Sequence, residues 1–271
     1  MYKIYSTGQQ FLDENLDIIR NDPLGTIFFE ENAKAIDKCN QNDFAVRVEK
    51  DSKLLLAIHV GDYPLVLYGS ECCANELAEV VVKHQLSFCN TIGPYELSTA
   101  FLTAYEQLVG GSHTVRLPMD IMRCEQVIPC DTSRVERATE SDANEIAQLV
   151  IDFTYEAVDE KSAWGEVFED VSRRIGSYAL LRADGKIVSI ASGYDEDNGL
   201  CRLSNVYTVP QYRNKGYSRK VVTYVTEQAL TKNQLPFLHV DKRNPVSNHL
   251  YLKVGYVYGK SRYEMEYRKT K

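Results

Sequence analysis

Residues 206–222 read VYTVPQYRNKGYSRKVV and are the most informative part of the chain. A run rich in β-branched residues leads to Pro210, and a short basic loop that contains Gly216 precedes a segment with helical character. This order predicts a strand, a loop and the start of a helix. Backbone N–H groups at a helix N-terminus bind anions, and a glycine lets the backbone approach a ligand closely. The stretch therefore predicts an anion site whose natural ligand is a pyrophosphate.

The predicted loop does not match the two commonest phosphate-binding motifs. A Walker A loop needs G-x-x-x-x-G-K-[ST] and a dinucleotide fingerprint needs G-x-G-x-x-G, whereas Gly216 is the single glycine of this loop. The spacing Arg213-x-x-Gly216-x-Ser218 instead resembles the acetyl-CoA loop [QR]-x-x-G-x-[GA] of the GNAT superfamily of N-acetyltransferases. Ser218 departs from the usual Gly or Ala but is also small. The alternative interpretation of these six residues is a solvated helix start with scattered basic side chains.

A second motif follows roughly 30 residues later, at the spacing and in the order of the same superfamily. Residues 244–256 read NPVSNHLYLKVGY and resemble the GNAT signature N-x-x-[AS]-x-x-[LI]-Y-x-K-x-G-[FY]. The apolar residues recur at helical spacing, and Gly255 would end that helix. The resemblance implies that Tyr251 protonates the departing thiolate, and the alternative is that Tyr251 is a core-facing aromatic residue.

Together the two motifs imply a GNAT N-acetyltransferase domain over residues 134–271. After a first short strand near Arg134, we predict a helix that begins at Ser141 and a second helix over 163–175. Strands are predicted over 178–182, 187–193, 200–209 and 237–241. The order β-α-α-β-β-β-α-β-α-β is that of a GNAT domain, in which helices flank a mixed, mostly antiparallel sheet.

The first half of the chain, residues 1–123, precedes a predicted linker over 124–133 that contains Pro129 and small polar residues. In this half we predict helices over 11–19, 76–83 and 95–109 and strands over 43–48, 54–60, 65–70, 86–91 and 114–122. The segment 93–101, GPYELSTAF, resembles the G-P-x-x-L-[AS]-x-x-F segment of a group of two-domain bacterial GNAT proteins. We therefore interpret this half as a mixed α/β, degenerate GNAT-like domain without acetyl-CoA, and the whole chain as α/β (α+β).

The resemblance also implies acetyl-CoA as co-substrate and gives roles to individual residues. The predicted pyrophosphate-binding amides are those of Asn214, Lys215, Gly216, Tyr217 and Ser218, with Arg213 beside them. Val206, Tyr207 and Thr208 would face the pantetheine arm and the acetyl carbonyl, and Asn244 would contact the same arm. These residues predict direct acetyl transfer, within a ternary complex, to the primary amine of a small molecule, with Tyr251 as general acid.

The general base is not identified by the sequence. Many members of the family carry a carboxylate on the strand before the loop, and residues 200–209, LCRLSNVYTV, have none. The open alternatives are a water relay, an amine of low pKa, or one of Asp195, Glu196, Asp197, His239 and Asp241. The missing carboxylate also leaves open a second function, an acyl-CoA-binding regulatory or scaffold protein with little or no turnover.

Composition is that of a globular protein, with 44% hydrophobic and 25% charged residues. No apolar run approaches the ~20 residues of a membrane span, and the N-terminus has no apolar signal region. Seven cysteines form no C-x-x-C pair and five histidines form no cluster. These observations predict a cytoplasmic protein with reduced thiols, no metal and no membrane partner.

Charge differs between the two halves. Residues 1–130 hold 10 Lys and Arg against 18 Asp and Glu, a net charge of −8, whereas the rest has a net charge of +1. The second half is therefore expected to hold the anionic cofactor, and the acidic half could attract a cationic amine or could be an ordinary solvated surface. A chain of this acidity is not expected to bind nucleic acid. The sequence is compatible with a homodimer and does not decide the oligomeric state.

Overall fold

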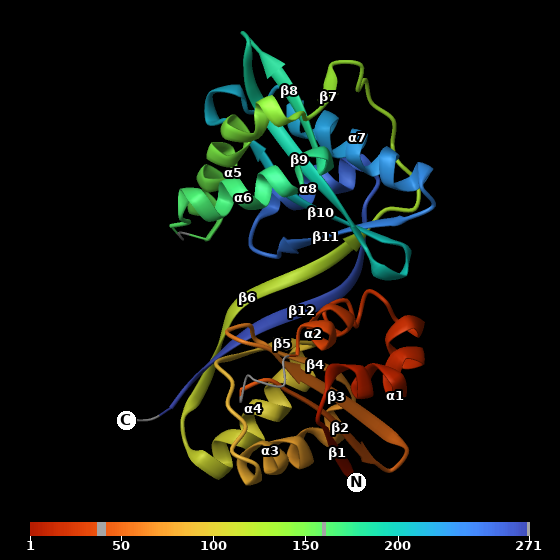
Figure 1. The fold of residues 1–271 in the computed structure, drawn as a ribbon, viewed down its shortest axis with the longest axis vertical. Helices are drawn as coiled ribbons and strands as arrows, with labels where there is room; N and C mark the ends of the chain where they lie inside the picture. Colours follow the sequence, from red (N-terminus) through yellow and green to blue (C-terminus); the bar gives the residue numbers. More distant parts are fainter. Residues whose placement is uncertain (37–41, 159–160, 270–271) are drawn as a thin grey trace. The chain divides into compact units, whose positions relative to one another are not determined.

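The computed structural model describes residues 1–36, 42–158 and 161–269. The chain divides into two compact units: one holds the elements coloured red to yellow in Figure 1 together with most of the dark blue last strand, and the other holds most of the green to blue elements. The first unit contains residues 1–121, 241–243 and 260–271, and the second contains residues 122–240 and 244–259.

The two halves of the chain contain the same elements in the same order. The first half contains β1 (Tyr2–Tyr5), α1 (Gly8–Asn21), α2 (Phe29–Ala35), β2 (Phe44–Lys50), β3 (Lys53–His59), β4 (Leu65–Gly69), α3 (Ala74–Lys83), β5 (Asn90–Gly93), α4 (Tyr95–Val109) and β6 (Ser112–Arg123). The second half contains β7 (Val135–Arg137), α5 (Ala143–Val158), α6 (Trp164–Arg173), β8 (Tyr178–Ala183), β9 (Lys186–Glu196), β10 (Leu200–Thr208), α7 (Tyr217–Thr231), β11 (Leu235–Asp241), α8 (Pro245–Val254) and β12 (Val257–Arg268). Each half therefore has the order β-α-α-β-β-β-α-β-α-β, which confirms the predicted fold class.

The pairing of the strands repeats as well. The first four strands of each half pair with their sequence neighbours in antiparallel fashion, β1 to β4 in one and β7 to β10 in the other. In each half the fourth strand then pairs in parallel with the fifth, β4 with β5 and β10 with β11. A parallel pair needs a crossover connection, and α3 and α7 provide it. The sheet is therefore mixed and mostly antiparallel.

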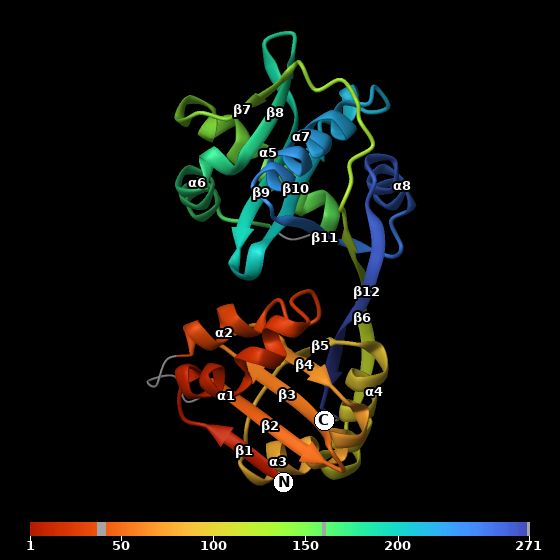
Figure 2. The ribbon, with the colours of Figure 1, turned by 90° about the vertical axis from the view of Figure 1, so that its right-hand side faces the viewer.

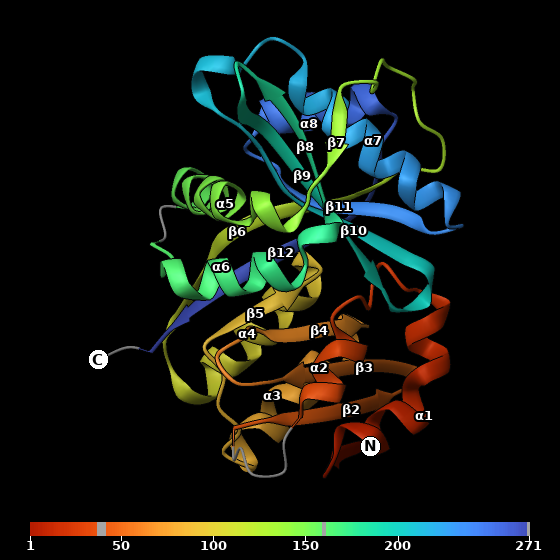
Figure 3. The same ribbon diagram turned by 45° about the horizontal axis from the view of Figure 1, so that its top comes forward.

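Helices cover both faces of the strands in each unit. In the first unit, α1 and α2 share one apolar cluster with the strands, and α3 and α4 share another on the opposite face (Figure 2). In the second unit, α5 and α6 pack on one face and α7 and α8 on the other (Figure 3). The alternation of buried side chains along each strand supplies both faces, as in β8, where Tyr178 and Leu180 face α5 while Ala179 and Leu181 face α7.

The last strand belongs to a different unit from the one that the sequence predicts. Residues 134–271 were expected to form one domain, whereas residues 260–269 pack with the first unit. There β12 pairs antiparallel with β5, with Tyr263 opposite Gly93, and lies between β5 and β6 in the strand order. Conversely, Met122 at the end of β6 and Cys124 in the predicted linker are fully buried in the core of the second unit. The sequence does not reveal this assignment of the last strand, because tertiary contacts decide which distant strands pair.

Most predicted elements are found within a few residues of their expected bounds. One predicted strand is displaced, and two elements of the structure were not predicted at all. The strand expected over 86–91 is β5 at Asn90–Gly93, and Leu86 and Phe88 instead pack against the apolar cluster beneath α3 and α4. The short elements β1 and α2 were not predicted. Four- and seven-residue segments give too little periodicity to be recognised in a sequence.

A buried histidine makes the stability of the first unit sensitive to pH. His59 is 3% exposed and stacks on Phe44, with ring centroids 5.4 Å apart. Burial lowers the pKa of His59 below its ordinary value of 6.5. The unfolded chain therefore binds a proton at this residue before the folded chain does, so the free energy of unfolding should decrease as pH falls through ~6.5. Urea unfolding at about pH 7.5 and about pH 5.5 measures this change, and His59→Gln should reduce it. Equal pH dependence in both proteins would contradict the prediction.

Candidate functional site

The loop between β10 and α7 has a backbone shaped by two residues in the left-handed region. A short 3-10 turn over Pro210–Tyr212 follows β10. Asn214 has φ 63° and Gly216 has φ 77°, and α7 begins at the next residue. A Cβ added at Gly216 would meet no atom within 4 Å. The space in front of this helix start is therefore open, as the sequence predicts for a ligand site.

Six consecutive backbone N–H groups, at the end of this loop and in the first turn of α7, have no partner in the described part of the chain. The first hydrogen bond of α7 runs from the Lys220 N–H to the Gly216 carbonyl, 3.3 Å. Within the described ranges, no acceptor is found for the N–H groups of residues 214–219. Helix N-termini leave such donors unsatisfied, and the partial positive charge of the helix dipole lies behind them. Six adjacent free donors at an open surface form a site that an anion fits.

The strand that leads into the loop separates from its neighbour. β10 pairs with β11 over Leu200–Arg202, and the pairing extends no further along the described strands. At the far end of β10, the Val209 N–H donates to the Val188 carbonyl of β9, 3.0 Å. Because the hydrogen-bonding direction alternates along a strand, the backbone groups of Thr208 point away from β9, toward the side where β11 has separated.

The basic side chains of the loop mostly contact other parts of the second unit. Arg213 donates to the Thr208 carbonyl at 2.9 Å and to Glu156 of α5 at 2.6 Å. The hydrogen bond with Glu156 raises the pKa of Arg213. The Lys215 ammonium lies over the Tyr212 ring, 4.9 Å from its centroid. The structure therefore presents the backbone amides to the open space, while Arg213 connects β10 to α5.

Tyr251 lies on α8 and is 8% exposed. Burial raises its pKa above the ordinary value of 10.0. Its ring contacts Tyr256 edge-on, with centroids 5.9 Å apart, whereas its hydroxyl has no hydrogen-bond partner among the described residues. Asn244, which was predicted to contact the cofactor, caps α8 by accepting from the Ser247 N–H at 3.1 Å. Burial thus favours the neutral form of this phenol, and its hydroxyl is not engaged by any residue that the structure describes.

The predicted residues come together on one face of the second unit. Tyr251 belongs to the apolar cluster beneath α7 and α8, and Val206, Tyr212 and Tyr217 pack against the same cluster. The separated end of β10, the loop and α8 therefore contribute to the same apolar cluster of the second unit. Tyr207 is the exception, because its side chain is buried on the opposite face, with α5 and α6.

The carboxylates considered as general bases are engaged in ion pairs. Asp195 pairs with Lys232 at 3.0 Å, Glu196 with Arg202 at 2.7 Å and Asp241 with Arg243 at 2.8 Å. The hydrogen bond from Arg243 lowers the pKa of Asp241. The side chain of Asp197 lies outside the described residues. None of the paired carboxylates is thus an uncommitted base.

A polar cluster on β10 was not recognised from the sequence as a functional group. Asn205 has φ 50°, and its side-chain amide donates to the hydroxyls of Tyr178 and Tyr194 at 2.7 and 3.0 Å. These residues come from three neighbouring strands. Positive φ at an asparagine is a conformational signal that a sequence alone does not carry.

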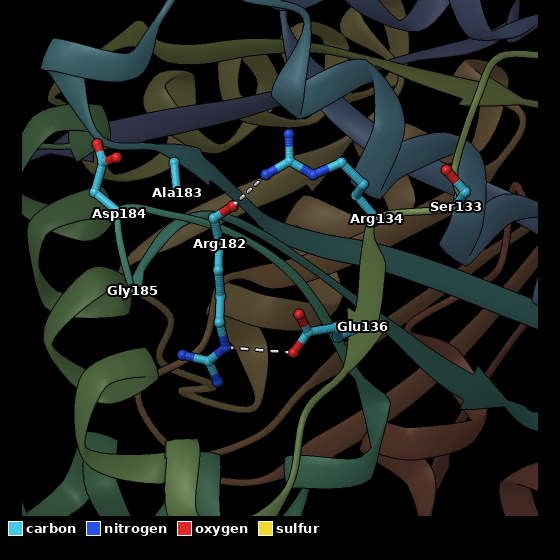
Figure 4. A pocket seen from close by; sticks show the side chains of 7 residues that line it. All are labelled: Ser133, Arg134, Glu136, Arg182, Ala183, Asp184 and Gly185. Carbon is cyan, nitrogen blue, oxygen red and sulfur yellow. Dashed lines mark hydrogen bonds and ion pairs between the residues drawn. The ribbon is translucent and has the colours of Figure 1, made fainter.

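A separate hollow of about 370 Å³ lies around the turn between β8 and β9 (Figure 4). In it the Arg134 guanidinium donates to the Arg182 carbonyl at 3.3 Å, and the Arg182 side chain reaches Glu136 at 3.3 Å. Its lining contains none of the residues predicted to bind the cofactor. In the described ranges no helix is long and apolar enough to cross a membrane, and no three His, Cys, Asp or Glu side chains are grouped to ligate a metal.

A loop of free amides at a helix start, beside a parallel strand pair that separates, is the arrangement that the two sequence motifs predict. Residues 143–256 match the model of the Acetyltransferase (GNAT) family. This part of the chain is therefore a GNAT acetyltransferase domain, which confirms the assignment that the two motifs predicted. Among curated proteins, none matches the chain significantly.

Solved structures resemble the whole chain, including its first half. A GCN5-related N-acetyltransferase from Sphaerobacter thermophilus aligns with a TM-score of 0.65 and 15% identity, over 98% of this chain and 95% of that one. A GNAT-family acetyltransferase from Colwellia psychrerythraea aligns with a TM-score of 0.62 and 11% identity, over 100% of both chains. At these identities the likeness concerns the fold. It extends the GNAT-type architecture to residues on both sides of the matched segment.

Proposed function

We propose that the protein transfers an acetyl group from acetyl-CoA to the primary amine of a small molecule by direct transfer in a ternary complex. The observation that carries the proposal is the set of free N–H groups at residues 214–219 beside the separated end of β10. Acyl transfer as the general reaction follows from the family of residues 143–256. Acetyl as the transferred group and an amine as its acceptor are the proposed part.

The loop would hold the pyrophosphate of the cofactor. Its donors face an open space, and the positive end of the α7 dipole adds a favourable charge. The proposed ligands are the amides of Asn214 to Ser218. Arg213 would act through its contacts with Thr208 and Glu156, so it would hold the loop against α5 and would not itself clamp a phosphate. This role differs from the direct contact that the motif implies.

The separated end of β10 would align the thioester. The Thr208 N–H points away from β9, and the same alternation carried two residues back gives Val206 the same direction. A backbone donor aimed at the thioester oxygen would stabilise the negative charge that develops there. Holding the amine and the thioester in line can remove ~7–11 kcal/mol of the barrier. Geometry would therefore provide most of the catalysis.

Tyr251 would donate a proton to the departing thiolate. Its burial favours the neutral phenol, and its hydroxyl has no competing partner among the described residues. An acceptor amine of low pKa would depend less on a general base, because a larger fraction of the amine is already neutral before transfer. The ion-paired state of the nearby carboxylates favours such an amine or a water relay.

Titration calorimetry with acetyl-CoA tests the position of the cofactor. In Gly216→Glu, a carboxylate at a backbone φ of 77° would face the pyrophosphate, and binding should weaken by about 2 kcal/mol, or roughly 30-fold. Gly185→Glu is the matched control, since Gly185 also has φ near 74° and open space around its Cβ. It should bind acetyl-CoA as the wild type does. Equal weakening in both variants, or no binding by the wild type, would reject the proposed site.

A second function is supported by the ion pairs of Asp195, Glu196 and Asp241, which leave none of these three carboxylates uncommitted. The protein would then bind an acyl-CoA as a regulatory or scaffold protein and turn it over little or not at all. A panel of amino acids, polyamines and aminoglycosides, assayed by release of free CoA thiol, separates the two functions. Thiol release with one class of amine supports the transferase, and binding without release in every case supports the second function.

A further inference from the structure

The clearest irregularity of the second unit lies in β10, immediately before the separated end of the strand. Ser204 is opposite Ser192 and Tyr207 is opposite Ile190, so two residues of β10 stand against Ala191 alone. Such an insertion is a β-bulge. Asn205 is the first of these two residues, and its φ of 50° is in the left-handed region that the first residue of a G1-type bulge adopts.

The bulge reverses the faces of the strand. Cys201 and Leu203 lie in the cluster beneath α7, whereas Tyr207 lies in the cluster beneath α5 and α6. In a regular strand these three odd-numbered residues would share one face. The same reversal applies to the backbone, because the direction of hydrogen bonding alternates with the same period. The bulge therefore decides the direction of the amides at Val206, its second residue, and at Thr208, which follows it. The Val206 side chain packs in the cluster beneath α7, on the opposite face from Tyr207, so its amide points away from β9 as that of Thr208 does.

The side chain of Asn205 is held from two neighbouring strands. Its Nδ2 donates to Tyr178 of β8 at 2.7 Å and to Tyr194 of β9 at 3.0 Å, and the two hydroxyl oxygens lie 3.3 Å apart. Tyr178 is fully buried, and the Arg174 guanidinium covers the Tyr194 ring at 4.2 Å from its centroid. Both phenols thus have fixed positions, and so does the amide that donates to them.

We infer that Asn205 is a positioning residue, which aims the Val206 N–H at the thioester oxygen by fixing the β10 bulge. The inference rests on the proposed function. Asparagine suits the position for two reasons: it tolerates the left-handed region better than other side-chain-bearing residues, and its amide can donate to both phenols. Glycine would adopt the left-handed backbone but has no amide to donate to the two phenols, so the bulge would no longer be held in place by a side chain.

The test uses the carbonyl stretching band of acetyl-CoA labelled with ¹³C at the thioester carbonyl, measured by infrared difference spectroscopy on the full-length protein. A hydrogen bond to the thioester oxygen lowers the frequency of this band. In the wild type we expect a lowered frequency, and in Asn205→Gly we expect most of that shift to be lost. The dissociation constant for acetyl-CoA should stay within about threefold, because the loop amides are unchanged.

Two further variants separate positioning from folding. The pair Tyr178→Phe with Tyr194→Phe removes both acceptors and keeps ring volume, so it should lose the band shift as Asn205→Gly does. Asn233→Ala is the matched control: Asn233 also has positive φ, 57°, and lies at the turn after α7. Its stability should fall, whereas the band shift should stay that of the wild type. With an amine found by the screen, Asn205→Gly should lower kcat by about 10²-fold with little change in the KM for acetyl-CoA.

The possible outcomes have distinct meanings. If the wild type does not bind acetyl-CoA, the proposed function fails and this inference fails with it. If the wild type binds without a band shift, or if Asn205→Gly keeps the shift, the inference fails while the acetyl-CoA site stands. If Asn205→Gly does not fold, the paired phenylalanine variant decides by the same readout.

Discussion

Expressed on its own, the first half of the chain, residues 1–123, should fail to form a cooperatively folded domain. The strand that completes its sheet comes from the other end of the chain. β12 pairs with β5, and Met265 is fully buried in the cluster beneath α3 and α4. Without residues 260–269, β5 would present an unpaired edge and this cluster would be open, which favours aggregation. The loss should be complete, since large buried surfaces typically contribute more than the 5–15 kcal/mol of net stability that domains possess.

Two aromatic contacts fix the position of the last strand on the first unit. Tyr263 packs against Tyr95 at 5.0 Å and Tyr267 against Phe88 at 6.2 Å between ring centroids. Arg262, buried in the same unit, donates to the Gly25 carbonyl at 2.8 Å. A fragment with residues 257–269 appended after a flexible linker should therefore recover a cooperative transition in urea.

In the matched control, the chain is cut between its two halves and every residue is kept. A protease site placed within residues 124–133 of the full-length protein should, after cleavage, leave the two segments associated and folded, because β12 is still present. Circular dichroism and size-exclusion chromatography measure both results. A cooperative unfolding transition of the isolated fragment 1–123 would contradict the prediction.

Tyr251→Phe should lower kcat for acetyl transfer by about 10²-fold or more, because general acid catalysis typically contributes 10²–10⁴-fold. The dissociation constant for acetyl-CoA should change little. Stability should also change little, because the hydroxyl bonds to no described residue and the ring is retained. The raised pKa of Tyr251 also predicts how kcat depends on pH. Because the pKa of this phenol lies above its ordinary value of 10.0, the phenol stays protonated up to that pH, and its ionisation should cause no loss of kcat below pH 10.0.

Tyr256→Phe is the matched control for this substitution. The Tyr256 hydroxyl is buried and lies 2.9 Å from the Thr226 hydroxyl, so removing it should cost about 1 kcal/mol of stability. It should leave kcat nearly unchanged. An unaltered kcat in Tyr251→Phe would show that Tyr251 is a packing residue, and equal losses in both variants would attribute the effect to disturbance of the shared ring contact.

Local chemistry explains why so much of the second unit could be predicted. The run 206–222 specifies a strand, a left-handed glycine and a helix start, all of which depend on neighbours in the sequence. The helix with Tyr251 has its own cap at Asn244 and its own stop at Gly255, which has φ 113°. The element order and the left-handed glycine at the start of α7 follow from such signals, and the structure agrees with them.

Tertiary contacts decided the rest. The partner of Arg213 is Glu156, 57 residues earlier, and that pairing changes the expected role of a motif residue. Asn205 acquires its significance from two phenols on other strands. The sequence by itself determined most elements of each half and the backbone of the loop before α7, because those features rest on interactions within a few residues. Only the tertiary structure decided which unit receives β12 and where β10 bulges, because both depend on pairing between strands whose sequences would permit more than one partner.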